Sequence, residues 1–238
     1  MTQTLTQQAA ALFDIQLTPE QAAQFDAYAR ELLAWNAHTN LTAITEPEAI
    51  QVRHFLDSLS IVKAVQLRPG MRVIDVGTGA GFPGLPLRIA FPAIHLTLLE
   101  ATGKKVAFLD HVIKMLGLER VETLHARAEE AGHDPKRRAS YDLVLARAVA
   151  RLPSLLEYLL PLARVGGYCI AMKGKTAQEE ADSSTRALST LGGRLKGIVT
   201  VHLPDVTEEH HLVVVEKVAH TPAQYPRRPG IPTQKPLI

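Results

Sequence analysis

The stretch VIDVGTGAGFPG, residues 73–84, joins an apolar run to a glycine-rich turn. Asp75 lies near the end of the apolar run, and four glycines follow it: Gly77, Gly79, Gly81 and Gly84. Glycine has no Cβ, so such a turn lets the backbone approach a ligand closely and take positive φ where needed. These residue types at this spacing predict a binding site for a nucleotide-like cofactor.

Two nucleotide loops can be compared with this stretch. A P-loop fails, because the only Gly-Lys-Thr is Gly174–Thr176 and Cys169 stands where the first glycine of that motif belongs. The dinucleotide fingerprint G-x-G-x-x-G matches in the frame that starts at Gly79, and Glu100 follows at roughly the spacing of a ribose contact. A nicotinamide-dependent oxidoreductase therefore remains one alternative.

A third interpretation uses more of the residues. Asp75 and the three glycines that follow it at alternate positions give D-x-G-x-G-x-G, which resembles motif I of class I S-adenosylmethionine-dependent methyltransferases. That cofactor has no pyrophosphate but carries an ammonium and a sulfonium, so an acid beside the loop suits it. Glu100, at the tip of the next strand-like run, is expected to accept both ribose hydroxyls. A ligand-free strand–helix turn explains neither acid.

The elements that must position these residues alternate between strand and helix. Strand-like runs occupy 72–76, 94–99, 120–124, 141–146 and 167–172, and helical patterns occupy 83–91, 104–116, 153–164 and 176–191. This alternation predicts a doubly wound α/β sheet, mostly parallel and Rossmann-like. Two further runs, 194–203 and 210–218, have no helix between them and predict a closing antiparallel hairpin. Ligands bind outside the carboxyl ends of such strands, so Arg147 is expected to face the cleft.

The flanking regions differ from this pattern. Residues 1–66 are expected to form a helical subdomain, with capping boxes at Thr18 and Thr45 that each start a helix. Residues 67–220 form the cofactor-binding domain, and residues 221–238 form a basic, proline-rich tail that lies on the surface or is partly mobile.

Polar residues in the helical region allow two interpretations. Arg53, His54 and Asp57 share one helical face, either as a patch beside the cofactor or RNA, or as a polar network that braces the helices. Asn36 and Asn40 are interpreted as caps of the turn after the first long helix.

The possible methyl acceptors are narrowed by missing motifs. The fourth strand ends in LARAVA rather than the Asn-Pro-Pro-Tyr type of motif that accompanies methylation of amino groups on bases. Carbon-5 methylation needs a cysteine nucleophile, but Cys169 lies in the middle of a strand and is expected to be core. An acceptor with its own exposed lone pair remains.

Composition limits the class of protein. Apolar residues make up 46% and charged residues 21% of the 238, and no apolar run approaches the ~20 residues of a spanning helix. A single cysteine excludes a disulfide framework or a cysteine-bound metal, and MTQTLTQQAA does not resemble a secretory signal. We expect a cytoplasmic, monomeric protein without a metal. The net charge of +2 means that any polyanion must be met by local patches.

Several longer motifs resemble one family specifically. The chain is similar to the RsmG (GidB) family over nearly its whole length, through WNAHTNLTAI (35–44), RHFLDSLS (53–60), VGTGAGFPGLPLRI (76–89), LARAVA (145–150), MKGK (172–175) and YPRRPGIPTQKPL (225–237). This resemblance implies methylation of N7 of one guanosine in bacterial 16S ribosomal RNA. The partner would be that RNA, the 30S subunit or an assembly intermediate. Methylation of another RNA, or a non-catalytic RNA-binding module, are the alternatives.

The resemblance also implies site residues. The expected S-adenosylmethionine contacts are Asp75, Gly77, Gly79, Gly81, Phe82, Glu100, Ala101, Thr102, Ala128, Glu129 and Arg147. The residues expected to line the RNA side and serve catalysis are Arg127, Arg147 and Lys173. Because N7 of guanine carries a lone pair and no proton, the implied reaction needs no general base.

Overall fold

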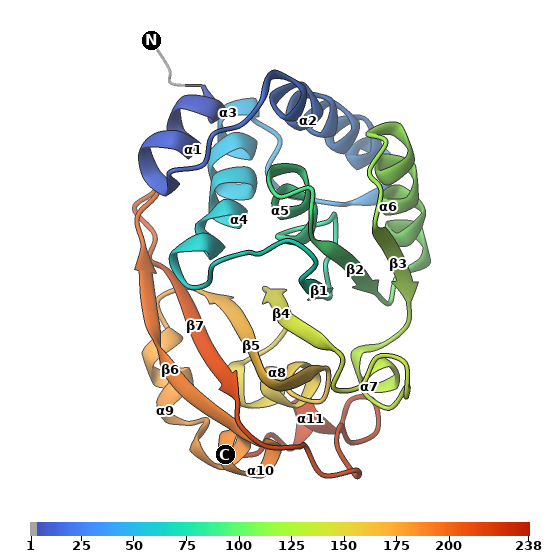
Figure 1. Ribbon diagram of the computed structural model, residues 1–238, viewed down its shortest axis with the longest axis vertical. Helices are drawn as coiled ribbons and strands as arrows, with labels where there is room; N and C mark the ends of the chain where they lie inside the picture. Colours follow the sequence, from blue (N-terminus) through green and yellow to red (C-terminus); the bar gives the residue numbers. More distant parts are fainter. Residues whose placement is uncertain (1–3) are drawn as a thin grey trace.

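The computed structural model describes residues 4–238 and has one seven-stranded sheet between two layers of helices (Figure 1). Its order is β3-β2-β1-β4-β5-β7-β6, with β1 to β5 parallel and β7 antiparallel to both of its neighbours. The strands are β1 (Arg72–Val76), β2 (His95–Glu100), β3 (Val121–His125), β4 (Tyr141–Arg147), β5 (Ala163–Lys173), β6 (Gly193–Val201) and β7 (His210–Lys217). The predicted doubly wound sheet with a closing hairpin is confirmed.

The helices divide between the two faces of the sheet (Figure 1). One layer contains α1 (Leu5–Phe13), α2 (Pro19–Thr39), α3 (Pro47–Ile50), the π-helix η1 (Gln51–Leu56), α4 (Asp57–Leu59), the 3-10 helix η2 (Ser60–Lys63), α5 (Gly84–Ala90) and α6 (Gly103–Met115). The other contains α7 (Ala128–Ala131), α8 (Leu152–Leu159), α9 (Ala177–Asp182), α10 (Thr185–Leu191) and α11 (Ile231–Gln234). No helix within residues 4–238 has both the length and the apolar character needed to cross a bilayer.

Strand alternation divides the core into two halves. Val73 packs with the layer that holds α2, whereas the next residue, Ile74, packs with the layer that holds α8. This is the period of two expected for strands buried on both faces. Cys169 lies in the second half, 1% exposed, and burial raises the pKa of its thiol to about 12. The prediction that this cysteine is core is therefore confirmed.

Some local predictions need correction. The predicted helix over 176–191 is two helices, because Ser184 turns its hydroxyl back onto the Glu180 carbonyl and the chain breaks there. The capping box at Thr18 is confirmed, but the helix at Pro47 starts after Glu46 without a side-chain cap, so the Thr45 prediction is wrong. The helical prediction for residues 1–66 includes residues 1–3, which lie outside the described part of the chain.

Candidate active site

The candidate site lies at the carboxyl edge of the parallel strands. β1 pairs with both β2 and β4. From β1 the chain adds β2 and β3 on one side and then β4 and β5 on the other, so the topological switch point lies between β1 and β4. Open α/β sheets bind their ligands outside this switch point. Glu100, Arg147 and Lys173 are the last residues of β2, β4 and β5. The sheet therefore brings the predicted residues to one edge although they are distant in sequence.

A cavity of about 230 Å³ lies at the ends of β1, β2 and β3, and we refer to it as the cofactor cavity. The Glu100 carboxylate is 7% exposed and accepts hydrogen bonds from the backbone N–H groups of Gly79 at 3.0 Å and Thr102 at 2.8 Å. These two bonds fix the orientation of the carboxylate. The lining residues are Val76, Gly77, Leu99, Glu100, Ala101, Ala126, Arg127, Ala128, Glu129, Val149, Ala150, Tyr158 and Thr233.

The glycine loop closes the end of β1. Gly77 and Gly79 have φ of +66° and +62°, a region that residues with a Cβ rarely adopt. A Cβ on Gly77 would lie 2.8 Å from Val149, whereas a Cβ on Gly79 would meet no atom within 4 Å. The loop is thus tight on one side and leaves open space at its tip. On its other side, Tyr28 of α2 donates its hydroxyl to the Ala80 carbonyl.

The dinucleotide interpretation does not fit this loop. In that motif the backbone N–H groups at the start of the helix face a pyrophosphate. Here the Gly84 N–H donates to the Asp75 carboxylate at 2.8 Å, and Gly84 is buried. A fixed acid thus stands where the pyrophosphate would need a free donor.

Asp75 supports the loop from beneath. It is fully buried, and its Oδ2 accepts from Gly84 N and from the Thr78 hydroxyl at 2.6 Å, while its Oδ1 has no partner. Burial raises the pKa of this carboxyl from 3.8 to about 6, against the lowering effect of its two hydrogen bonds. The side chain therefore lies behind the loop, with one oxygen unused by the protein.

Asp75→Asn tests this burial. A carboxyl whose pKa is raised in the folded state contributes stability that is complete below its unfolded pKa and is lost as pH rises through the folded pKa, here about 6. Asparagine keeps the accepting oxygen and carries no charge. We expect the free energy of unfolding of the variant, minus that of the parent chain, to rise by roughly 1–1.5 kcal/mol from pH 5 to pH 7.5. Urea unfolding of the cofactor-free protein measures this difference. If the stability difference between variant and parent does not change with pH, the pKa of the buried Asp75 carboxyl is not raised.

Arg147 is held by residues of the N-terminal helices. Its guanidinium donates to the Asp57 carboxylate at 3.0 Å and to the Arg53 carbonyl at 3.1 Å, and lies 3.2 Å from His54 Nδ1. Asp57 is 4% exposed and also contacts His210 Nδ1 at 3.0 Å. This hydrogen bond raises the pKa of His210. One carboxylate therefore links β4, β7 and the N-terminal region.

Aromatic packing completes this support. His54 stacks on Phe82 with ring centroids 4.4 Å apart, and the Arg147 guanidinium lies 5.0 Å from the centre of the Phe82 ring. Burial lowers the pKa of His54 to about 4, with Arg147 contributing, so the ring is neutral at pH 7. Its other nitrogen contacts the Thr42 hydroxyl at 2.8 Å, in the turn that Asn36 caps through Leu41 and Thr42.

The two interpretations of the N-terminal polar residues can now be compared. His54 and Asp57 form the bracing network, and the residue that they brace is Arg147. Arg53 pairs with Glu208 through two hydrogen bonds of 3.0 and 3.1 Å, two residues before the His210 that Asp57 contacts. Arg53 and Asp57 thus both face residues 208–210, and His54 and Asp57 both contact Arg147, although Arg53 and His54 lie in the π-helix η1.

A second cavity, of about 380 Å³, lies on the far side of the segment after β4 and is here named the acceptor cavity. Arg147 and Lys173 line it together with Asp57 and His210. The Lys173 ammonium is 2.8 Å from the Glu180 carboxylate and donates to the Ala150 carbonyl, so it fixes that segment. Arg127 instead lines the cofactor cavity and is exposed. RNA-side roles for these residues stay predictions.

The residues of the two cavities that the sequence did not predict include Val149, Tyr158, His210 and Thr233. Ala148 lines the acceptor cavity and Val149 the cofactor cavity, so the segment after β4 separates the two. The positive φ of Ala148, +56°, marks this change of direction. The LARAVA motif indicated the segment but not its path. Nothing in the sequence placed the hairpin or the tail beside it.

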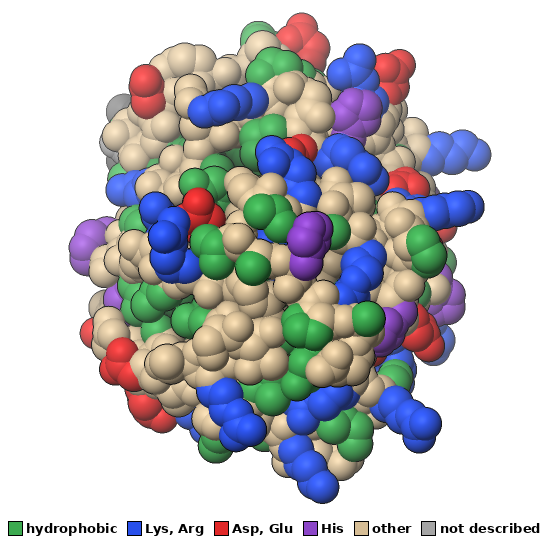
Figure 2. Space-filling model, turned by 60° about the horizontal axis from the view of Figure 1, so that its bottom comes forward, with side chains coloured by type: hydrophobic (Ala, Val, Ile, Leu, Met, Phe, Trp, Pro, Cys, Tyr) green, Lys and Arg blue, Asp and Glu red, His purple; other side chains and the backbone are tan. Residues whose placement is uncertain are grey.

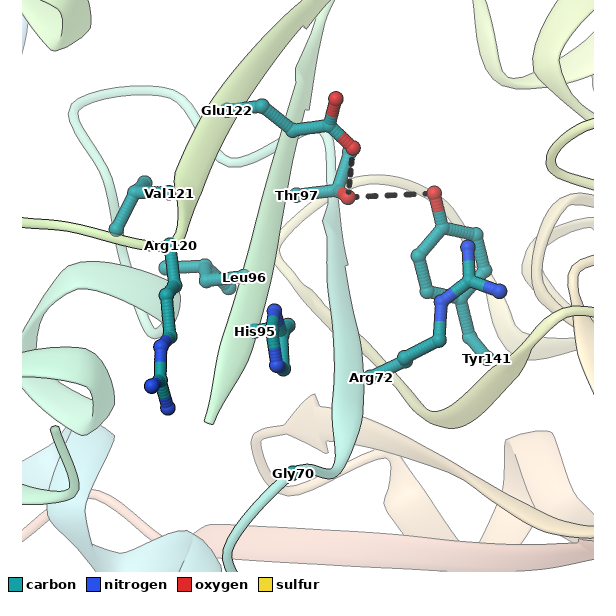
Figure 3. Close-up of a pocket in the computed structure, with 9 residues that line it drawn as sticks. All are labelled: Gly70, Arg72, His95, Leu96, Thr97, Arg120, Val121, Glu122 and Tyr141. Atoms are coloured by element: carbon teal, nitrogen blue, oxygen red, sulfur yellow. Dashed lines mark hydrogen bonds between the residues drawn. The ribbon is translucent and has the colours of Figure 1, made fainter. Parts of the chain in front are cut away.

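The opposite edge of the sheet has a hollow of about 410 Å³ (Figure 3). Its side chains bind one another: Thr97 donates to Glu122 at 2.8 Å and accepts from Tyr141 at 3.2 Å, and Arg72 lies 5.2 Å from the Tyr141 ring centre. These residues lie at the amino ends of the strands, away from the edge where open sheets bind ligands.

Comparisons with known proteins identify the family and the fold. The model of a family described as rRNA small subunit methyltransferase G (GidB) matches residues 21–213. Ribosomal RNA small subunit methyltransferase G of Desulfitobacterium hafniense is 47% identical over 94% of this chain and 93% of that protein. The protein of the same name from Pelotomaculum thermopropionicum is 48% identical over 94% and 93%. A SAM-dependent methyltransferase from Aquifex aeolicus shares the fold, with a TM-score of 0.54, 19% identity and coverage of 73% of this chain and 94% of that one.

Proposed function

Since this chain belongs to the rRNA small subunit methyltransferase G (GidB) family, we propose that it methylates N7 of a specific guanosine in bacterial 16S ribosomal RNA. S-adenosylmethionine is its methyl donor. The observation that supports the finer proposal is the pair of cavities on either side of residues 148–150, one lined by Glu100 and the glycine loop and the other by Arg147 and Lys173. The site of action would be the cytoplasm, where ribosomal subunits are assembled.

The residues of the cofactor cavity fit this donor. Glu100 is oriented to accept ribose hydroxyls, and the space at Gly79 admits a ligand against the backbone. Asp75 lies behind the same loop, outside the cavity lining, and holds the loop in place through Thr78 and Gly84. When bound, S-adenosylmethionine supplies a methyl group on a positively charged sulfur. The chain has to place an acceptor in line with that methyl.

Guanine N7 suits an acceptor cavity of this kind. Its in-plane lone pair carries no proton, so the chain needs no general base, and positioning supplies most of the acceleration. Arginine commonly pairs with the O6 and N7 edge of guanine. Because N7 must stay free to react, we propose that Arg147 holds O6 or a nearby phosphate. The inert Cys169 thiol leaves no role for a cysteine nucleophile.

RNA binding would rely on dispersed charge. Figure 2 shows Lys and Arg side chains spread over the visible face rather than gathered in one dense patch. With a net charge of +2, this distribution favours weak, salt-sensitive binding of free RNA. An assembled subunit or an assembly intermediate, which offers additional contacts, is the proposed substrate.

The test is transfer of labelled methyl groups from S-adenosylmethionine to 16S RNA, free and in 30S subunits, followed by mass mapping of the product. Label on N7 of one guanosine is the expected result. Label on another atom or on another RNA would replace the finer proposal and leave the methyltransferase family unchanged. A second arm maps ribosomal RNA from cells that lack the protein, in which that single methyl group should be missing.

A further inference from the structure

The C-terminal tail, residues 221–238, is bound along α8 rather than free. Ser154 donates its hydroxyl to the Pro232 carbonyl at 2.8 Å. One turn further along α8, the Glu157 carboxylate accepts from the Arg227 backbone N–H at 2.7 Å and from its guanidinium at 2.6 Å. These contacts pin the tail to successive turns of one helix.

The pairing of Glu157 is obligatory. Its side chain is 0% exposed, and an unpaired charge at such a position costs several kcal/mol in the folded state. The path before Arg227 is fixed as well, because Arg138 donates to the carbonyls of Thr221 and Tyr225, each at 2.8 Å. Arg227 is therefore engaged within the protein, and the tail has one defined path.

This path brings the tail to the cofactor cavity. Tyr158, the neighbour of Glu157 on α8, lies with its hydroxyl 3.0 Å from the Thr233 hydroxyl, and both residues line the cavity. The Gly230 N–H donates to the Glu129 carboxylate at 3.2 Å, and Glu129 lines the same cavity. Two residues far apart in sequence thus form a hydroxyl pair beside the expected adenosine contacts.

We propose that the tail forms the wall at the adenine end of the cofactor pocket, and that the hydroxyl pair of Thr233 and Tyr158 contacts the adenine edge. The proposal rests on S-adenosylmethionine as the ligand and deepens the proposed function. With Glu100 as the proposed ribose contact, the hydroxyl pair is a polar feature of the cavity that is left for the base. Adenine presents an amino donor beside ring-nitrogen acceptors, and a pair of hydroxyls can both accept and donate.

The deciding variants are Thr233→Val and Tyr158→Phe, which remove one hydroxyl each with little change of shape. Calorimetry without RNA should show S-adenosylhomocysteine binding about 3- to 10-fold more weakly in each, the effect of one lost hydrogen bond. The inosine analogue S-inosylhomocysteine, in which an oxygen replaces the amino group, tests the base directly. The parent chain should prefer adenine, and both variants should lose most of that preference.

Arg227→Ala and Arg228→Ala form a matched pair for the tail itself. Arg227 is bound to Glu157, whereas its neighbour Arg228 is exposed. Arg227→Ala should weaken cofactor binding and Arg228→Ala should not. Because Arg227→Ala leaves a buried carboxylate unpaired, its melting temperature is measured alongside, and the decision rests on the milder hydroxyl variants.

The outcomes separate this inference from the proposed function. Parental affinity and parental base preference in both hydroxyl variants would overturn the adenine contact, although methylation of guanosine N7 would still stand. Conversely, the parent chain could methylate another atom while Thr233→Val still weakens S-adenosylhomocysteine binding as expected. That result would overturn only the proposed acceptor. A parent chain that binds no S-adenosylhomocysteine would overturn the adenine contact together with the cofactor assignment.

Discussion

Arg147→Ala is expected to slow methyl transfer by roughly 100- to 1,000-fold while weakening S-adenosylmethionine binding less than about 10-fold. The guanidinium lines the acceptor cavity, not the cavity that contains Glu100 and Glu129. Loss of a charged group aimed at the reacting partner affects the transition state more than it affects the cofactor. Single-turnover rates with 30S subunits, set against calorimetric affinity for the cofactor, measure the two effects separately.

Two control variants show whether charge or geometry matters. Arg147→Lys keeps the positive charge but has one nitrogen in place of two, whereas Nη1 of Arg147 bonds Asp57 and the Arg53 carbonyl and Nη2 lies beside His54. We expect it to recover only part of the rate. Arg194→Ala removes an exposed arginine paired with Glu216 on the closing hairpin and should change neither quantity. Equal losses of rate and affinity in Arg147→Ala would make Arg147 a cofactor ligand instead.

The position of Arg147 shows how much of the site could be predicted from the sequence. A buried strand pattern ending in LARAVA placed this residue at the carboxyl edge, because strand direction and the switch-point rule follow from element order alone. The same reasoning placed Glu100. Both predictions depend on periodicity and on chain order, which a sequence displays directly.

The supports of Arg147 could not be predicted in this way. His210 reaches Asp57 only because β7 returns antiparallel beside β5, and the register of that hairpin depends on side-chain packing. Arg53 and Asp57 both reach the segment that enters β7, at Glu208 and His210, and no spacing rule within the N-terminal region predicts that these are their partners. A shift of one residue in the register of a strand or helix decides such contacts, and rules based on regular spacing do not predict such shifts.

The tail illustrates a different limit. Its composition predicted a basic, proline-rich segment that lies on the surface or is partly mobile, without indicating what it contacts. The decisive signal was elsewhere, in LPSLLEYLL, where Glu157 interrupts an apolar helix that is buried on every side. A carboxylate in such a helix needs a cationic partner, but the sequence does not indicate which of the many arginines provides it.

The strongest expected effect on cofactor affinity comes from Glu100. Glu100→Ala should raise the dissociation constant for S-adenosylmethionine by about 100-fold or more, because two hydrogen bonds from ribose hydroxyls to a carboxylate are worth roughly 1.5–3 kcal/mol each. Glu100→Gln should weaken S-adenosylmethionine binding to a similar degree. The carboxylate accepts from the N–H groups of Gly79 and Thr102, one on each oxygen, and an amide would turn a donor toward one of them.

Rate measurements distinguish Glu100 from Arg147. If Glu100 acts through cofactor binding, saturating S-adenosylmethionine should restore most of the transfer rate in Glu100→Ala, whereas no cofactor concentration should rescue Arg147→Ala. Glu122→Gln is the matched control, since Glu122 lies on the neighbouring strand β3 at the opposite edge of the sheet and should leave cofactor affinity unchanged. A Glu100→Ala variant with parental affinity would mean that the carboxylate only fixes the glycine loop. The ribose would then have to be held by another group of the cavity, with Glu129 the remaining carboxylate in its wall.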